Sequence, residues 1–181
     1  DEGKYAMSAD GATLFVPNVG NGGKQVQRVD VATRKVVGAL DGFPRTSAVA
    51  ASPDGKLLAV AGRDDAGGKD TAYLIQVVEL ETKKVIATMR SHESRINALA
   101  WVSDLVAGSK SFRLVSGSWD HTVKMWDPAS GAELLSLPMG PRAGDRAEHL
   151  WIAPDGSRVL ATNGFPYAGS NGDAVLMWGA R

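Results

Sequence analysis

Residues 114–127 read Leu-Val-Ser-Gly-Ser-Trp-Asp-His-Thr-Val-Lys-Met-Trp-Asp, and this stretch decides how the chain folds. Two short apolar segments, 114–116 and 123–126, flank a turn of polar residues. Short segments of this kind, separated by Gly, Ser and Asp, are typical of paired β-strands. The stretch therefore predicts a β-hairpin.

The same order of segments occurs four times along the 181 residues. The second segment of the hairpin ends at positions 29, 78, 126 and 178, which are spaced by 48 to 52 residues. An apolar segment precedes each hairpin, and a fourth follows it in the first three units. Four short β-rich segments per unit, without helical periodicity, predict a four-stranded antiparallel sheet that repeats as the blades of a β-propeller.

We therefore expect an all-β chain in which residues 1–181 form one partial propeller. Its blades cover residues 5–40, 46–89, 94–137 and 146–181. Each blade has strands a to d in chain order, except that the last blade lacks strand d.

The composition argues against several classes of function. Twenty basic and twenty acidic residues cancel, so the charge favours neither a nucleic-acid nor a membrane partner. The absence of cysteine excludes disulfides, thiol catalysis and zinc sites that need sulfur. No apolar run approaches the roughly 18 residues of a membrane helix. We expect no cofactor and no metal, and the composition leaves the compartment open, cytoplasmic or exported.

Residues 91–137 resemble the WD40 repeat. Ser91-His92 stands where the family has Gly-His, and 114–127 matches its Ser-Gly-Ser-x-Asp-x-Thr-Val-Lys-x-Trp-Asp run. The first unit, 14–37, is more similar to the YVTN-type propeller repeats of exported prokaryotic proteins. WD40 sheets usually belong to larger rings, so the resemblance implies part of a seven- or eight-bladed propeller. Two copies in one eight-bladed ring, or a closed four-bladed ring, are the alternatives.

The resemblance also implies a buried chain of hydrogen bonds within the third blade. Asp120 in the b–c turn would bind His92 in the d–a loop, and His92 would bind Ser116, which would meet the indole of Trp126. Buried imidazole and indole N–H groups need partners, so a complete set would fix the geometry of the blade. The first, second and fourth units have Val16, Val60 and Ala161 at the position of Ser116, so this tetrad is predicted once.

The same serine, histidine and aspartate could also form a hydrolase triad. A catalytic serine needs an exposed, strained position beside an oxyanion hole. Ser116 instead lies in the middle of a predicted strand. We therefore expect a chain that is not an enzyme.

In a WD40-type propeller the b–c and d–a loops share one face, and three of the four b–c hairpins here are long. We predict that this face binds a protein partner. Aromatic and arginine side chains dominate binding hot spots, and the candidates here are Trp119, Arg95, Phe165, Tyr167, Arg142 and Arg146. Trp119 is the preferred anchor, with an exposed indole that points away from the tetrad.

The predicted function is therefore a scaffold for protein–protein interaction. The partners are unidentified proteins, together with the remaining blades of the same propeller or a second copy. The alternative is a propeller module of an exported or periplasmic enzyme or electron-transfer protein, which the first unit suggests.

Overall fold

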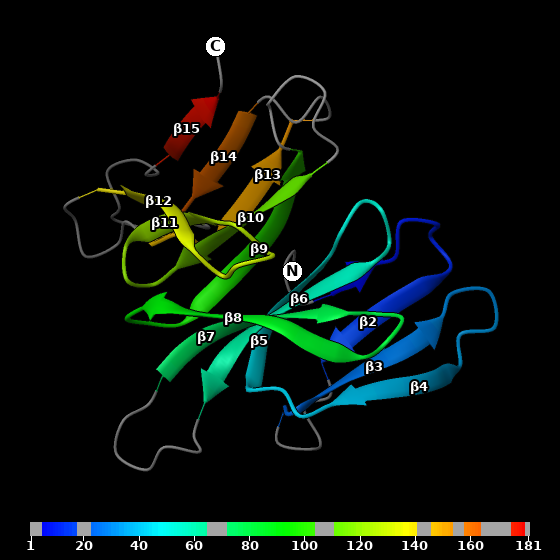
Figure 1. Cartoon of the computed structure of the whole chain (residues 1–181). Coiled ribbons are helices and arrows are strands. Elements are labelled where there is room, and N and C mark those ends of the chain that lie inside the picture. Colours follow the sequence, from blue (N-terminus) through cyan, green and yellow to red (C-terminus); the bar gives the residue numbers. More distant parts are fainter. Residues whose placement is uncertain are drawn as a thin grey trace, which may run out of the picture.

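The computed structural model describes residues 5–17, 23–64, 72–103, 111–140, 146–153, 158–163 and 175–179. These residues form three four-stranded antiparallel sheets and one three-stranded sheet. The sheets follow one another in chain order, as Figure 1 shows. The predicted all-β fold with repeated blades is confirmed. The described residues include no helix that is long and apolar enough to cross a membrane.

Each sheet is a meander whose strands pair in the order of the sequence. The first consists of β1 (Ala6–Met7), β2 (Thr13–Pro17), β3 (Gln25–Asp30) and β4 (Val36–Asp41). The second consists of β5 (Arg45–Ala51), β6 (Leu57–Asp64), β7 (Ala72–Glu79) and β8 (Lys84–His92). The third consists of β9 (Ile96–Ser103), β10 (Phe112–Ser118), β11 (Thr122–Trp126) and β12 (Glu133–Pro138). The fourth consists of β13 (His149–Ile152), β14 (Arg158–Thr162) and β15 (Val175–Gly179).

The first strands of successive sheets lie next to one another. Strand β1 contacts β5, β5 contacts β9, and β9 contacts β13. The sheets therefore converge along their first strands, which is the arrangement of propeller blades around an axis.

Two of the a–b turns form through the same local chemistry. Asp10 accepts a hydrogen bond from the Ser8 hydroxyl, and Asp54 accepts one from the Ser52 hydroxyl. Each aspartate also accepts the backbone N–H two residues further on. The glycine after each aspartate has a positive φ, so the Asp-Gly pair in the sequence marks the turn.

Side chains that alternate along a strand supply two different cores. On β6, Leu58 and Val60 pack into the cluster shared with the first sheet. Ala59 and Ala61 pack into the cluster shared with the third sheet. Both faces of the second sheet are therefore buried, because it lies between two neighbours.

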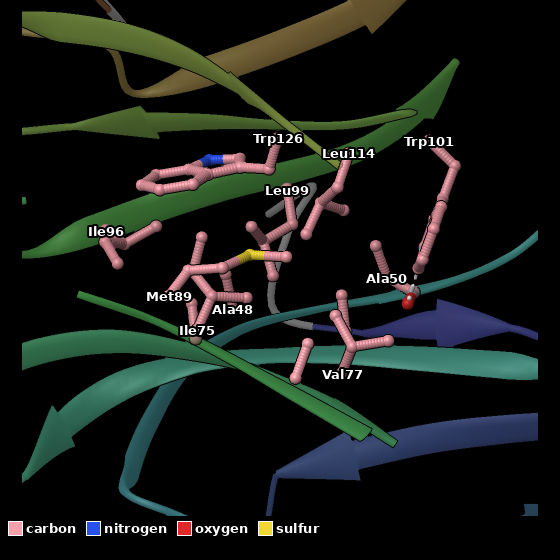
Figure 2. Packing of buried hydrophobic residues seen from close by; sticks show 13 residues of the cluster. Ala48, Ala50, Ile75, Val77, Met89, Ile96, Leu99, Trp101, Leu114 and Trp126 are labelled. Carbon is pink, nitrogen blue, oxygen red and sulfur yellow. Dashed lines mark hydrogen bonds between the residues drawn. The ribbon is translucent and has the colours of Figure 1, made fainter. Parts of the chain in front are cut away.

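The interface between the second and third sheets pairs small side chains with large ones. The second sheet contributes alanines, including Ala48 and Ala50, and the third contributes the rings of Trp101 and Trp126 (Figure 2). The Trp101 indole N–H donates to the Ala50 carbonyl at 3.0 Å. The alanines leave room for the indoles, so side chains of the two faces interdigitate.

Gly117 on β10 lies close against Ala147, which precedes the first strand of the fourth sheet. A Cβ atom at Gly117 would lie 2.9 Å from the Ala147 Cβ and 3.1 Å from the Ala147 carbonyl oxygen. Ala147 is fully buried, and neither of these atoms can rotate away. Glycine is therefore required here by space.

We predict that Gly117→Ala lowers the free energy of unfolding by about 1–3 kcal/mol, the usual cost of overpacking. Urea unfolding measures the change. Gly38→Ala is the matched control, because a Cβ there meets no atom within 4 Å. Equal urea midpoints for the two variants would contradict the close packing of Gly117 on Ala147.

Candidate interaction face

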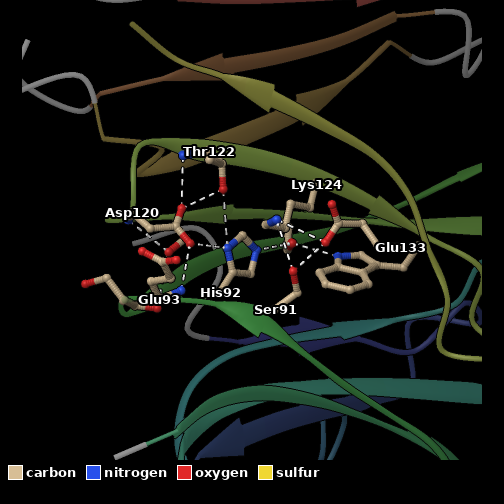
Figure 3. A network of polar contacts seen from close by, with 11 residues as sticks. Ser91, His92, Glu93, Asp120, Thr122, Lys124 and Glu133 are labelled. Carbon is tan, nitrogen blue, oxygen red and sulfur yellow. Dashed lines mark hydrogen bonds and ion pairs between the residues drawn. The ribbon is translucent and has the colours of Figure 1, made fainter. Parts of the chain in front are cut away.

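His92 lies at the centre of a hydrogen-bonded chain of buried side chains (Figure 3). Its Nδ1 lies 2.6 Å from the Asp120 Oδ2, and its Nε2 lies 2.7 Å from the Ser116 Oγ. The Trp126 indole N–H donates to the same Ser116 hydroxyl at 2.8 Å. Every bond is satisfied when Nδ1 carries the imidazole proton and Ser116 donates to Nε2. The chain of hydrogen bonds that the WD40 resemblance implies is present.

The tetrad joins two sheets, although the sequence places it within one blade. His92 is the last residue of β8 in the second sheet, where it pairs with Tyr73. Its partners lie on β10, on β11 and in the turn between them, all in the third sheet. The expected d–a loop position of His92 is wrong, because the strand continues up to the histidine. The tetrad is thus a bridge between blades.

A second polar group that the sequence did not reveal extends this bridge. Lys124 on β11 is buried, and its ammonium group lies 3.2 Å from the Ser91 Oγ and 3.0 Å from the Glu133 Oε2. Ser91, next to His92 on β8, donates to the same Glu133 oxygen at 2.5 Å. The sequence held one signal for this group. Lys124 occupies a position at which the alternation of side chains along the strand predicts that the side chain points inward. The end of β8 is therefore held to the third sheet at two adjacent residues.

The groups around Asp120 stabilise the negative charge of its carboxylate. Partial burial is the largest single effect and raises the pKa of this carboxyl, whereas the hydrogen bond from His92, and its charge when the imidazole is protonated, lower it. The Thr122 hydroxyl and the Glu93 backbone N–H also donate to it and lower the pKa further. The net result is a pKa well below the usual value of 3.8. Asp120 is therefore an anion in the folded protein at neutral pH.

The b–c and d–a segments lie on one face, as backbone hydrogen bonds between them show. The Trp119 N–H donates to the Arg95 carbonyl at 2.9 Å, and the Ala147 N–H donates to the Ser118 carbonyl at 3.1 Å. In the first two sheets the Thr46 N–H donates to the Gly23 carbonyl at 2.9 Å. We call this surface the loop face, defined by residues 23–24, 42–46, 93–95, 118–121, 139–140 and 146–148.

Trp119 lies on the loop face, but its indole is more enclosed than the sequence suggests. The indole N–H donates to the Glu148 Oε1 at 2.6 Å, across to the fourth sheet. The guanidinium groups of Arg95 and Arg146 lie over the ring, 5.5 Å and 4.8 Å from its centroid. The expected freely exposed indole is wrong, because Glu148 and the two arginines hold and partly cover it. Trp119, Arg95 and Arg146 form one cluster of side chains.

The other predicted contact residues fall outside the described part of the chain. These are Phe165, Tyr167 and Arg142. The tips of the long b–c hairpins, residues 18–22, 65–71 and 164–174, also lie outside it.

A pocket of about 470 Å³ lies beside this cluster, between the second and third sheets. Seven residues line it: Arg45, Thr46, Ser47, Arg63, Tyr73, Arg95 and Trp119. The Ser47 hydroxyl donates to the Ile96 carbonyl at 2.6 Å, which ties the first strands of the two sheets together next to the pocket. The pocket walls therefore come from two blades that are fixed to each other.

We predict that Asp120→Ala lowers the free energy of unfolding by about 1–3 kcal/mol, because it leaves the buried imidazole without its acceptor. Chemical denaturation measures the loss. His121→Asn is the control in the same turn, since His121 has a φ of 67°, which asparagine tolerates. An Asp120→Ala midpoint equal to that of the control would show that the tetrad does not stabilise the fold.

We also predict a pH dependence that depends on Asp120. Its folded pKa lies below the unfolded value, so its stabilising effect is complete above about pH 5 and is lost as the pH falls. The unfolding free energy of the wild type should decrease between about pH 5 and pH 2, and Asp120→Asn should make this decrease smaller. The slope should change by at most the amount that corresponds to the uptake of one proton. Part of the slope should remain, because the pKa values of Asp10, Asp30, Asp54 and Asp127 are also lowered. Parallel pH profiles for wild type and variant would exclude this effect.

Comparison with known protein families matches residues 83–127 to the WD domain, G-beta repeat family. The chain is 26% identical over 137 residues to a ribosome biogenesis protein WDR12 homolog of Drosophila persimilis, covering 70% of this chain and 29% of that protein. It is 32% identical over 83 residues to a U3 small nucleolar RNA-associated protein 15 homolog of Xenopus laevis, covering 46% of this chain and 13% of that protein. The chain thus spans less than a third of the length of these relatives.

Among solved structures, the hydrazine synthase of Kuenenia stuttgartiensis has a similar fold, with a TM-score of 0.70. The match covers 97% of this chain and 45% of that one at 22% identity, so it supports the fold alone. The repeat at 83–127 thus lies among sheets of the same architecture, with the hydrogen bonds of its motif in place. Residues 83–127 therefore carry a WD40 repeat, within a chain that has the fold of a β-propeller.

Proposed function

We propose that this chain is an interaction scaffold that binds a protein partner through its loop face and catalyses no reaction itself. The observation that carries the proposal is the cluster of Trp119, Arg95 and Arg146. Tryptophan and arginine are the side chains most enriched in binding hot spots, and rigid ones lose little entropy on binding. Here the Glu148 hydrogen bond holds the Trp119 indole, and the two guanidinium groups lie over its ring.

The burial of the tetrad supports a structural role for its serine and histidine. Ser116 is fully buried, and both nitrogens of His92 are engaged by Asp120 and by Ser116 itself. A nucleophile must reach its substrate beside an oxyanion hole. This arrangement favours a scaffold over a hydrolase.

The relatives support the scaffold in general terms. Their names refer to processes as different as ribosome biogenesis and axonemal dynein assembly. The same fold can serve unrelated functions, so the partner is determined by residues on the surface and not by the blades. We therefore assign partner choice to the loop face of this chain.

The test is affinity capture from the source organism with the wild-type chain, followed by binding measurements with the purified partner. Arg95→Glu should weaken the binding of that partner by about tenfold or more, because it reverses a charge at a contact site. Lys35→Glu is the control, since Lys35 is exposed in the c–d turn between β3 and β4. Both variants are first checked by thermal melting.

An opposite result would locate the contact on the outer edge of the blades. Strand β8 exposes Val85 and Ile86 there. A partner that tolerates Arg95→Glu and is lost on Val85→Asp would contradict binding through the loop face.

A further inference from the structure

The segment just before β13 joins the fourth blade to the third through hydrogen bonds on the loop face. The Glu148 carboxylate accepts two of them, from the Trp119 indole at 2.6 Å and from the Asn97 amide at 2.8 Å. The Ala147 N–H donates to the Ser118 carbonyl at 3.1 Å. The strand that follows, β13, lies against β9 and β10 of the third sheet (Figure 1). These bonds therefore attach the fourth blade where its first strand begins.

A carboxylate suits this junction because its two oxygens can accept from two separate donors. Asn97, one of the donors, is the extra residue of a bulge at the start of β9. Ser47 is the extra residue of the equivalent bulge in β5, and its hydroxyl donates to the Ile96 carbonyl of the next blade at 2.6 Å. A bulge can redirect a side chain out of the regular strand pattern. In both blades it brings a polar side chain to the following blade.

The apolar contact beneath these bonds consists of small and medium-sized side chains. It includes Val115 and Val123 of the third sheet and Leu150 of the fourth. The described members of this cluster include no aromatic ring, whereas the cluster between the second and third sheets includes Trp101 and Trp126. Stabilisation by burial grows with the apolar area removed from water. We therefore expect the fourth blade to open at a lower free-energy cost than the sheets before it.

The residues of this junction also form the cluster that we propose as the partner's contact. Trp119 and Arg95 belong to the third blade, and Arg146 precedes the first strand of the fourth. The guanidinium groups of the two arginines lie 5.5 Å and 4.8 Å from the centroid of the Trp119 ring. If the fourth blade opened, Trp119 would lose Arg146 and Glu148 together. The cluster is therefore complete only while the fourth blade is docked.

We propose that the protein partner binds across the junction between the third and fourth blades, and that its binding is coupled to the docking of the fourth blade. The inference rests on the proposed function and assigns a regulation to the same surface. A partner that contacts the complete cluster binds the docked form better than the open form, so it stabilises docking. The coupling is reciprocal, so docking raises the affinity for the partner by the same factor.

Hydrogen exchange of the backbone amides, measured by mass spectrometry on the 181-residue chain, tests the attachment first. Amides of β13 and β14 should exchange faster than those of β6 and β7, because the fourth blade opens separately. Trp119→Phe removes the indole N–H, and Glu148→Gln leaves one acceptor oxygen in place of two. Each variant should raise the exchange rates in β13 and β14 by about fivefold or more, through the loss of one hydrogen bond.

Two further variants make this result specific. Asn97→Ala removes the other hydrogen bond of Glu148 and leaves Trp119 unchanged, so it should raise the same exchange rates and decides the question if Trp119→Phe does not fold. Ser47→Ala is the matched control, because it removes the hydrogen bond from the equivalent bulge between the second and third blades. It should leave the exchange rates in β14 unchanged.

The coupling is tested with peptides from a random 12-residue phage library, selected on the wild type and depleted on Arg95→Glu, so that they bind the loop face. At a peptide concentration 100 times its Kd, exchange in β13 and β14 should slow by about 100-fold, because the opening of the blade releases the peptide. Arg146→Gln, on the fourth blade, should weaken the same peptides by about fivefold or more. Lys35→Gln should leave their affinity unchanged.

The opposite results can be told apart. Peptides that need Arg95 but leave exchange in β13 and β14 unchanged would place the contact on the third blade alone, which overturns the coupling and leaves the scaffold function intact. Equal exchange rates in β13, β14, β6 and β7 of the free chain would overturn the separate opening of the fourth blade. If neither a peptide nor a captured partner depended on Arg95, the proposed function and the coupling would both be wrong, whatever the exchange of the Glu148→Gln variant.

Discussion

His92 connects two blades. Its backbone completes β8 in the second sheet, and its two ring nitrogens are bound by Asp120 and Ser116 of the third sheet. The chain turns directly after this residue to begin β9, so the ring determines where the third blade starts. Arg95 and the b–c turn that carries Trp119 lie within that constrained corner. The buried tetrad therefore positions the loop face whose chemistry we assign to binding.

The interfaces between blades are stabilised by two kinds of interaction, apolar packing and buried hydrogen bonds. The first and second sheets meet through apolar side chains such as Phe15, Val26 and Leu58, whose packing tolerates small adjustments. The second and third sheets add a buried polar network in which each member needs all its partners. A polar network of this kind fixes one geometry, whereas apolar packing alone allows several of similar energy. The pocket lies at the interface that has the network.

The sequence predicted those features whose cause is local. Asp-Gly turns and alternating side chains predicted the strands, because a turn needs only a few consecutive residues and a strand shows its own periodicity. The tetrad was implied by the resemblance of residues 91–137 to the WD40 repeat. The surroundings of Trp119 did not follow, because Glu148 lies 29 residues away and meets it only when the fourth blade packs against the third.

The network of Lys124, Ser91 and Glu133 was missed for the same reason, since its members lie on three strands of two sheets. His92 was placed in a loop because sequence shows no boundary between the last residue of a strand and the first of a loop. What the sequence lacks is the contact between blades, which depends on how whole sheets dock.

The repeat that the family comparison identifies is out of step with the blade. Residues 83–127 begin at the fourth strand of the second sheet and end just after the third strand of the third sheet. A gene duplication that copied this repeat would therefore copy the histidine together with its hydrogen-bond partners, although they end up in different blades. Each added copy would carry the hydrogen-bonding residues that attach it to the preceding copy. Rings of this kind could thus gain or lose units during evolution without evolving a new contact between blades at each step.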